Sequence, residues 1–500
     1  TWDSFDFFTV SLTVRELAND FGKTPADITW GITLVLMFRS VGSILFGIAS
    51  DRWGRKWPFI VNNLLFIVLE LTGEPVMTGL DHVASIWKTM YSLPEPADLA
   101  KLGKSKYGTK HRELTYWILS LQAAQKEKKG SLKGTAFCQT YSQFLACRAM
   151  FGVAMGGIYG NAAATALEDL PDEARGLMSG ILQQGYSFGY LLCAAFARGL
   201  VGTSSSGWRP LYWFAACPPV LFIGVRLLLP ETNTFREGQR MRREADHAGR
   251  SAGSVFISEG KAALKHHWLL LIYLVLLMAG FNFLSHGSQD LYPTMLEDEL
   301  RFTPTDVTVT QIVANLGAMT GGTVVGFCSQ SLGRRFSIIV CCLVGGALLY
   351  PYGFAGDKSV MAAAFFQQFF IQGAWGVVPI HLMELSPGAF RTFVVGTAYQ
   401  LGNLVSSASS TIEAELGERF PLTSTQTGTK RYDYGKVMCI FLGCVYVYTL
   451  LLTLVGPERL HRKFDVGHDE DVQEAVGIDT GERLEDDGDG DGRKGDSKEF

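Results

Sequence analysis

The chain has 500 residues, of which 47% are hydrophobic and 33 are phenylalanine, and this composition favours a membrane protein over several soluble domains. The net charge of -4 is small, and no basic patch with interleaved aromatic residues indicates a nucleic-acid partner. No CxxC pair, metal-ligand cluster, phosphate loop or pairing of a nucleophile with a base is present. We therefore expect neither an enzyme nor a metal site.

Hydropathy predicts an all-α membrane protein. Twelve apolar stretches each approach the roughly 20 residues that a helix needs to cross a bilayer. They are 1–19, 27–49, 56–73, 145–167, 177–200, 210–229, 267–292, 307–330, 336–355, 359–382, 392–412 and 436–456. This number is typical of a transporter, with one bundle of six helices at 1–230 and a second at 267–456.

The first two stretches carry charges at membrane depth. Asp3 and Asp6 are one helical turn apart, so they are candidate proton or cation sites or lie at a wet helix end. The first stretch is short, and we expect its helix to begin upstream of Thr1. Arg39 lies roughly 18 Å by helical rise from the loop at Asp51. A guanidinium at this depth predicts either an anionic substrate or a structural ion pair.

A basic loop joins the second and third spans. Its pattern GxxxDRxGRK is made by Gly47, Asp51, Arg52, Gly54, Arg55 and Lys56. The pattern resembles the loop signature of the major facilitator superfamily, and the resemblance implies a gating loop. A degenerate copy lies at 326–335, and another pair of matching strings lies at 168–175 and 384–391. These repeats indicate two related halves.

The first half carries an insertion. The two copies of the basic loop are separated by more residues along the chain than the two strings at 168–175 and 384–391. The extra residues correspond to 74–134, a polar stretch. Alternation of the spans places this stretch outside the cell, where the repeat requires only a short turn. It is either a surface domain or an unspliced intron in the gene sequence, and its lack of apolar periodicity favours the intron. We assign it no function.

The fourth and fifth spans contain further candidates. Arg148 is followed by glycine four and eight residues later, a spacing that permits close helix packing. The pattern RxxxGxxxG also resembles the fourth-helix motif of the superfamily, whose arginine is implicated in coupling. The fifth span contains a stretch amphipathic enough to line a cavity, although aromatic packing explains it equally well: Gln183, Gln184, Tyr186, Ser187, Phe188 and Tyr190.

The loops predict the orientation of the chain. The central loop at 231–266 is basic, and Arg55 and Arg334 lie on the same side. Positively charged loops remain in the cytoplasm, so we expect both termini there, including a disordered acidic tail at 457–500. The seventh span then runs outward.

The seventh span ends in polar residues. On a continuous helix, residues spaced four apart form one polar ridge, which here consists of Asn282, His286, Asp290 and Thr294. Ser285 and Gln289 lie beside this ridge. An ionisable pair in a membrane is costly unless it faces a cavity, so the ridge predicts a substrate or proton pathway. Alternatively, His286 and Asp290 lie in interfacial water while the neutral groups join helices. Gln400 and Asn403 in the eleventh span either bind a carboxylate or join helices.

The ridge has the form Nxx[S/T]HxxQDxxxT, which is similar to the seventh-helix signature of the fungal Jen-type monocarboxylate–proton symporters, a branch of the major facilitator superfamily. The similarity covers nearly the whole chain outside 74–134 and the acidic tail. It implies substrate binding and proton coupling along the ridge. It also implies that Gln400, Asn403 and Phe188 influence the choice of substrate.

We therefore predict a monomeric plasma-membrane transporter that imports lactate, pyruvate, or a similar short monocarboxylate such as acetate or propionate, together with a proton. It needs a lipid bilayer and no cofactor other than the coupling proton. Arg39 or Arg148 would hold the carboxylate, and His286 with Asp290 would carry the proton. One alternative is a symporter of dicarboxylates such as succinate or malate, or of other organic anions, which a second arginine in the cavity would favour. Another is a non-transporting nutrient sensor, which would have a long cytoplasmic signalling domain.

Overall fold

The computed structural model describes residues 1–23, 25–71, 138, 140–201, 207–247, 252–355, 358–417, 419–422, 431–462 and 464. The insertion at 74–134 and the acidic tail after residue 464 lie outside the described residues. Each of the twelve predicted spans lies on one helix or on two consecutive helices.

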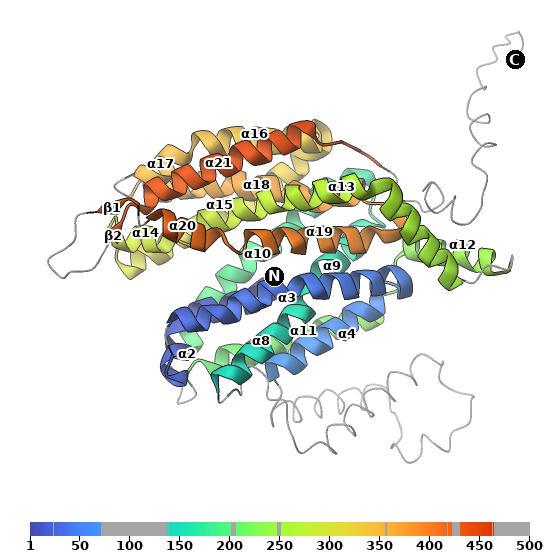
Figure 1. Ribbon diagram of the computed structural model, residues 1–500, viewed down its shortest axis with the longest axis horizontal. Helices are drawn as coiled ribbons and strands as arrows, with labels where there is room; N and C mark the ends of the chain where they lie inside the picture. The colour runs from blue at the N-terminus through green and yellow to red at the C-terminus, as the bar shows by residue number, and fades with distance from the viewer. Residues whose placement is uncertain are drawn as a thin grey trace, which may run out of the picture.

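The first half of the chain forms a group of helices that occupies the lower part of Figure 1. Its helices are α1 (Trp2–Leu12), α2 (Val14–Phe21), α3 (Pro25–Trp53), α4 (Lys56–Leu71), α8 (Tyr141–Gly156), α9 (Ile158–Leu167), α10 (Asp172–Leu200) and α11 (Arg209–Leu228). Two predicted spans are divided, between α1 and α2 and between α8 and α9.

The second half forms the upper group in Figure 1. Its elements are α13 (Ala252–Gln289), α14 (Tyr292–Asp298), α15 (Pro304–Leu332), α16 (Arg334–Ala347), α17 (Leu349–Phe354), α18 (Val360–Leu385), the 3₁₀ turn η2 (Gly388–Phe390), α19 (Arg391–Ser406), α20 (Ser409–Gly417) and α21 (Tyr434–Val455). A short antiparallel pair, β1 (Pro421–Leu422) and β2 (Arg431–Tyr432), precedes α21.

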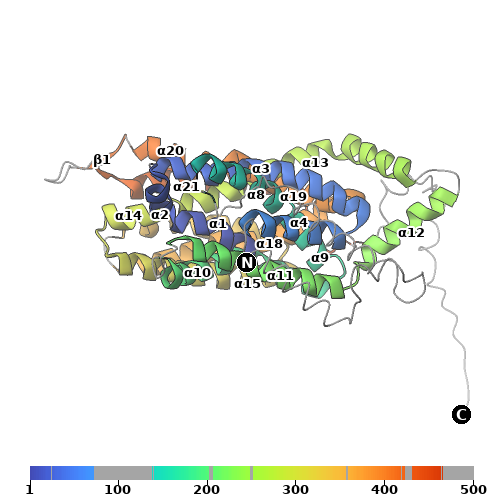
Figure 2. The ribbon, with the colours of Figure 1, turned by 90° about the horizontal axis from the view of Figure 1, so that it is seen from below.

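The central loop is more helical than the sequence predicts. It contains α12 (Asn233–His247), and α13 begins at Ala252, before the apolar stretch that starts at 267. In Figure 2, α12 and the first turns of α13 project from one end of the molecule. In sequence, residues 231–266 are polar and basic, in contrast to the apolar stretch that follows.

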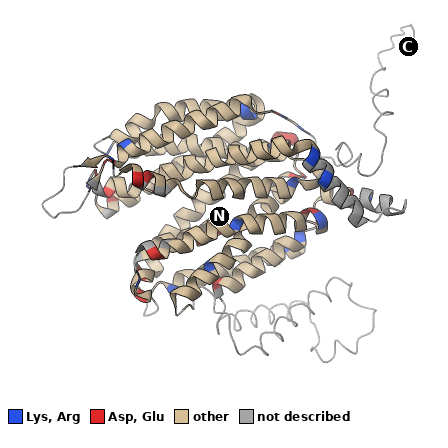
Figure 3. Cartoon of the chain, in the orientation of Figure 1, with Lys and Arg blue, Asp and Glu red and all other residues tan. Residues whose placement is uncertain are grey.

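The distribution of charge is that of a multi-pass membrane protein. Charged residues gather near the ends of the helices, and uncharged residues occupy most of their middle sections (Figure 3). By length and apolar composition alone, six of the described helices could cross a membrane.

Several pairs of helices join the two halves. Helix α3 of the first half packs on α19 of the second, and α10 packs on α15. The second contact is close: a Cβ on Gly180 would lie 2.5 Å from the carbonyl oxygen of Gly322. The remaining space between the halves contains the pocket described next.

Candidate functional site

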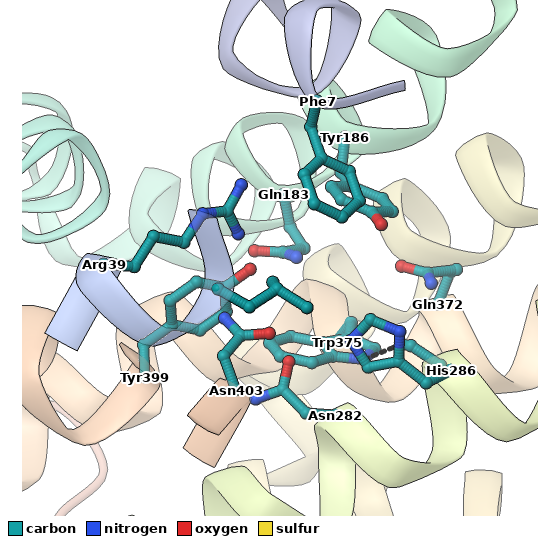
Figure 4. Close-up of a pocket in the computed structure, with 12 residues that line it drawn as sticks. Phe7, Arg39, Gln183, Tyr186, Asn282, His286, Gln372, Trp375, Tyr399 and Asn403 are labelled. Carbon is teal, nitrogen blue, oxygen red and sulfur yellow. Dashed lines mark hydrogen bonds between the residues drawn. The ribbon is translucent and has the colours of Figure 1, made fainter. Parts of the chain in front are cut away.

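A pocket with an empty volume of about 370 Å³ lies between the two halves (Figure 4). The first half contributes Phe7, Leu36, Arg39, Gln183 and Tyr186 to its lining. The second half contributes Asn282, Ser285, His286, Gln372, Trp375, Tyr399 and Asn403. Because each half supplies polar groups, a bound solute would contact both.

Arg39 on α3 is the basic residue of this lining that is charged at any physiological pH. Its side chain is buried, and the guanidinium lies 4.9 Å from the ring centre of Phe7. Its Nε and Nη2 atoms contact the sulfur of Met155. Among the described residues, no carboxylate lies within 4.0 Å of this guanidinium. Thioether sulfur is a weak acceptor, so Met155 compensates little of the positive charge, and the carboxylates of Asp3 and Asp6 act on it only from beyond that distance.

Arg148 is also buried, but the structure places it away from the pocket. Its Nη1 atom lies 3.3 Å from an oxygen of Asp6 and 3.2 Å from an oxygen of Glu70. None of these three side chains is exposed. Arg148 thus belongs to a structural ion-pair cluster, and Asp6 is its partner instead of lying at a wet helix end. Of the two arginines predicted to hold a carboxylate, only Arg39 lines the pocket.

The histidine and aspartate of the seventh span are in contact, as their spacing predicts. Nδ1 of His286 lies 3.3 Å from an oxygen of Asp290. The prediction that the ridge continues to Thr294 is wrong, because α13 ends at Gln289 and Thr294 belongs to α14. Asp290 follows the last turn of α13, and its side chain is 34% exposed. The pair therefore joins the pocket to the end of the helix.

The other ridge residues divide between the pocket and its surroundings. Asn282 lines the pocket and donates its side-chain amide to the Met278 carbonyl. Ser285 also lines it and accepts a hydrogen bond of 2.7 Å from the indole of Trp375. Gln289 is not part of the lining; its amide donates to the side chain of Gln368 within the second half.

Of the predicted substrate-binding residues outside the seventh span, some line the pocket and others lie outside it. Asn403 lines the pocket, and its amide donates to Oε1 of Gln400 at 3.2 Å. Gln400 is buried outside the lining and so orients Asn403. Phe188 does not line the pocket and is 39% exposed, whereas Gln183 and Tyr186 on the same helix face inward.

Sequence reasoning missed Trp375, Gln372 and Phe7. Gln372 had a detectable signal, because Gln368 and Gln372 are polar residues four apart in the apolar stretch 359–382. Trp375 and Phe7 had none, since aromatic residues are common in membrane helices.

The predicted gating loop connects the two halves. Asp51 accepts hydrogen bonds from the backbone N–H groups of Thr392 and Phe393 at the start of α19. Arg55 pairs with Asp51 at 3.0 Å and with Glu168 at 2.7 Å. Burial opposes the charge of Arg55, but Glu168 and Asp51 raise its pKa above the usual arginine value, so Arg55 stays charged. These contacts hold the halves together on the side of α12.

The rest of this loop shapes the turn. Gly54 has a φ of 100°, a conformation that glycine adopts most readily. Lys56 donates to the carbonyl groups at the end of α11, and Arg52 lies over the ring of Trp53. A Cβ on Gly47 would lie 2.8 Å from the Phe393 backbone, so this glycine permits the approach of α3 to α19.

Comparison with known proteins agrees with this architecture. The family model described as "Sugar (and other) transporter" matches residues 130–467. A carboxylic acid transporter protein homolog of Saccharomyces cerevisiae is 35% identical over 468 residues, which are 91% of this chain and 66% of the yeast protein. A cis,cis-muconate transport protein of Acinetobacter baylyi is 24% identical over 54% of this chain and 64% of its own. The chain thus spans about two thirds of the length of these relatives.

Solved structures show the same fold. The proton:xylose symporter XylE bound to 6-bromo-6-deoxy-D-glucose superposes with a TM-score of 0.64 at 16% identity, covering 93% of this chain and 95% of XylE. A human organic anion transporter superposes with a TM-score of 0.55 at 12% identity, covering 91% of this chain and 96% of its own. The family and its relatives are transporters, not enzymes, as the sequence predicts. The chain belongs to the sugar (and other) transporter family and has the fold of the major facilitator superfamily.

Proposed function

We propose that the protein is a proton-coupled symporter of short monocarboxylates such as lactate and pyruvate. The observation that carries this proposal is the Arg39 guanidinium, which is buried at the pocket without a carboxylate partner among the described residues. A buried charge without a counterion in contact is costly, and a substrate carboxylate would supply that contact. The amides of Asn282 and Asn403 lie in the same lining and can donate to the second carboxylate oxygen.

The charge of the lining favours one carboxylate over two. Among its described residues, Arg39 is the one arginine and His286 the one histidine, and no lysine is present. A dicarboxylate would leave its second anionic group with only neutral donors or with His286. The relatives named for carboxylic acid and muconate transport support an organic acid as substrate and leave the dicarboxylate as the alternative to test.

His286 and Asp290 are our candidates for proton coupling. The carboxylate of Asp290 lies beside the imidazole and favours its protonated form, while the neighbouring Arg39 opposes it. Binding of an anion at Arg39 would neutralise this opposing charge and thereby promote protonation of His286. Substrate and proton would then bind cooperatively, as symport requires.

We further propose that the protein lies in the plasma membrane with the end that carries α12 in the cytoplasm. The basic residues of the central loop support this orientation through the positive-inside rule. The pair of His286 and Asp290 then lies toward the outside, where the proton would enter.

Uptake of labelled lactate and succinate in cells lacking their own carboxylate permeases tests the substrate. We expect lactate to accumulate when the outside is more acidic than the inside, and unlabelled pyruvate to compete with it. Succinate should accumulate at least tenfold less. Preferential accumulation of succinate would show that the substrate is a dicarboxylate. Uptake of lactate and succinate that does not depend on the pH gradient would exclude proton symport.

Replacement of Asp290 by Asn tests the coupling pair. Loss of the carboxylate weakens protonation of His286, so lactate accumulation driven by an inward proton gradient should fall at least tenfold. Exchange of lactate at equal pH should survive in part, because exchange needs no net proton movement. Both fluxes are measured per amount of protein at the cell surface.

The matched control is Glu297→Gln, which removes an exposed carboxylate on α14 and should leave both fluxes unchanged. The double variant Asp290→Asn with His286→Ala should lose little more than either single variant, since members of one relay are not additive. Full gradient dependence in a well-expressed Asp290→Asn protein would remove the pair from the mechanism.

A further inference from the structure

Glu413 is a buried carboxyl group to which neither the sequence motifs nor the pocket assigns a role. It lies on α20, beyond the outer end of α19 (Figure 1). Its side chain is fully buried, and among the described residues neither carboxylate oxygen has a hydrogen-bond partner. An ionised carboxylate in such surroundings is strongly disfavoured, whereas a protonated carboxyl is neutral.

Glu413 faces the end of α13. A Cβ on Gly287 would lie 3.3 Å from Oε1 of Glu413, so this carboxyl faces the last turn of α13 across a glycine. Gly287 directly follows His286, and the backbone N–H of Asp290 still donates to the His286 carbonyl at 2.9 Å, so Asp290 lies close to this turn. Glu413 therefore adjoins the turn that carries the proposed coupling pair.

The charged and titratable groups around Glu413 leave its charge uncompensated. From the end of α13, Asp290 acts on it as a like charge. From α17, Tyr352 faces it, but the Tyr352 hydroxyl donates to the Ser288 carbonyl. From α21, Phe441 packs against Gly287 beside Glu413 and carries no charge. Two carboxylates near each other resist simultaneous ionisation, so a proton on one favours ionisation of the other.

We propose that Glu413 carries the coupling proton between the outside solution and the pair formed by His286 and Asp290. This proposal rests on the proposed proton symport and adds a third group to it. In the transfer, the O–H bond of the Glu413 carboxyl breaks and the proton passes to Asp290 or to a ring nitrogen of His286, directly or through water. Glu413 is left as a carboxylate, and it takes up the next proton from outside water.

The test is Glu413→Gln, which keeps the size and polarity of the side chain but cannot carry a proton. We expect lactate accumulation driven by an inward proton gradient to fall at least tenfold, while lactate exchange at equal pH stays within twofold of the parent. Alkalinisation of the outside medium during uptake, measured with a pH electrode, should fall in proportion to accumulation. Glu413→Asp, which restores a carboxyl group, should recover part of both signals.

The matched control is Glu415→Gln, an exposed carboxylate two residues away on the same helix, which should leave all three measurements unchanged. If the parent protein accumulates no carboxylate with protons, the proposed function fails. If the parent is proton-coupled and Glu413→Gln accumulates lactate like the parent, the function stands and the role of Glu413 is refuted. Equal loss of accumulation and exchange at normal surface expression would also refute it, since it indicates a structural role.

A measurement on the unchanged protein covers the case in which Glu413→Gln does not reach the membrane. Dicyclohexylcarbodiimide reacts with protonated carboxyl groups in apolar surroundings. We expect mass spectrometry of the labelled parent protein to find the adduct on Glu413 at neutral pH and less of it at alkaline pH. Absence of the adduct, or labelling that does not change with pH, would overturn the proposal.

Discussion

Arg39 and Arg148 differ in their partners although both are buried arginines in membrane helices. Arg148 has two carboxylates within hydrogen-bond reach, at Asp6 and Glu70, whereas Arg39 has a thioether and an aromatic ring. A guanidinium that is already paired gains little from an anionic substrate. Replacement of Arg39 should therefore affect transport, whereas replacement of Arg148 should affect stability.

For Arg39, we expect the change to Lys to raise the KM for lactate about tenfold, or about 1.4 kcal/mol. Lysine keeps the charge but lacks the planar pair of donors that matches a carboxylate. Surface expression should stay normal. The control is Arg198→Lys, an exposed position on α10, which should leave the KM unchanged. A parental KM in Arg39→Lys would show that this guanidinium does not hold the carboxylate.

For the cluster around Arg148, we expect replacement of the arginine to cost much more stability than replacement of one of its two carboxylates. Arg148→Met leaves two buried carboxylates without a counterion and should destabilise the protein by about 3–5 kcal/mol. Glu70→Gln retains the pair of Arg148 with Asp6 and should change stability by less than about 1 kcal/mol. Thermal unfolding in detergent measures both. Equal stability of the two variants would contradict the cluster as a structural unit.

The contact between α3 and α8 places Arg39 through backbone packing. A Cβ on Gly156 would overlap the carbonyl oxygen of Arg39, and one on Gly152 would lie 2.6 Å from the carbonyl of Val35. The glycines that follow Arg148 at four-residue spacing thus bring α8 against the turn of α3 that carries Arg39. Close backbone approach of this kind is how small residues associate membrane helices.

We therefore expect Gly156→Ala to push α3 away from α8 and to displace Arg39 from the pocket. The overlap should cost about 1–3 kcal/mol in stability and reduce lactate uptake strongly. Gly346→Ala on α16 is the matched control, because a Cβ there meets no atom within 4 Å. Unfolding temperature and uptake are measured for both. Parental behaviour of Gly156→Ala would mean that the helix contact tolerates a larger separation.

At the scale of the whole molecule, the two halves are held together at the end that carries α12. Asp51 of the first half binds the start of α19, and Gln330 of the second half accepts a hydrogen bond from the backbone of Gly176 near the start of α10. The two contacts are related by the repeat, since Asp51 and Gln330 occupy equivalent positions in the two copies of the loop. This end of the pocket is therefore closed.

The segment after α21 adds a third link at this end. Phe464 is buried, with the Arg175 guanidinium 4.1 Å and the Arg391 guanidinium 4.5 Å from its ring centre. Arg175 lies in the first turn of α10 in the first half, and Arg391 is the first residue of α19 in the second half. The ring of Phe464 therefore contacts both halves. Arg462 beside it donates to the carbonyl groups of Glu384 and Ser386.

Phe464→Ala should therefore favour opening of this end by about 1 kcal/mol, roughly a fivefold shift in population. Spin labels on cysteines placed at Trp53 and Leu332, exposed ends of α3 and α15, report the separation of the halves. Pulsed electron resonance should show a larger population at long distance in Phe464→Ala. The control Leu454→Ala, half exposed on α21, should match the parent. An unchanged distance distribution would exclude Phe464 as a link.

The sequence by itself determined the spans, the repeat and the local contacts of the polar ridge. Apolar length is enough to locate a membrane helix, and residues four apart on a helix must be neighbours, which is why His286 and Asp290 are in contact. The same rule failed at Thr294, because the helix ends at Gln289 and a new helix follows. Local spacing predicts contacts only while the helix continues.

Only the tertiary structure decided which polar residues face the pocket. Arg39 and Arg148 are alike in hydropathy and depth, and their roles separate because Asp6 and Glu70, far away in the chain, surround one of them. Phe188 and Gln183 lie on one helix, and the rotation of α10 against α15 turns only Gln183 toward the pocket. Helix rotation and partner choice depend on packing between distant segments, which apolar length and residue spacing do not encode.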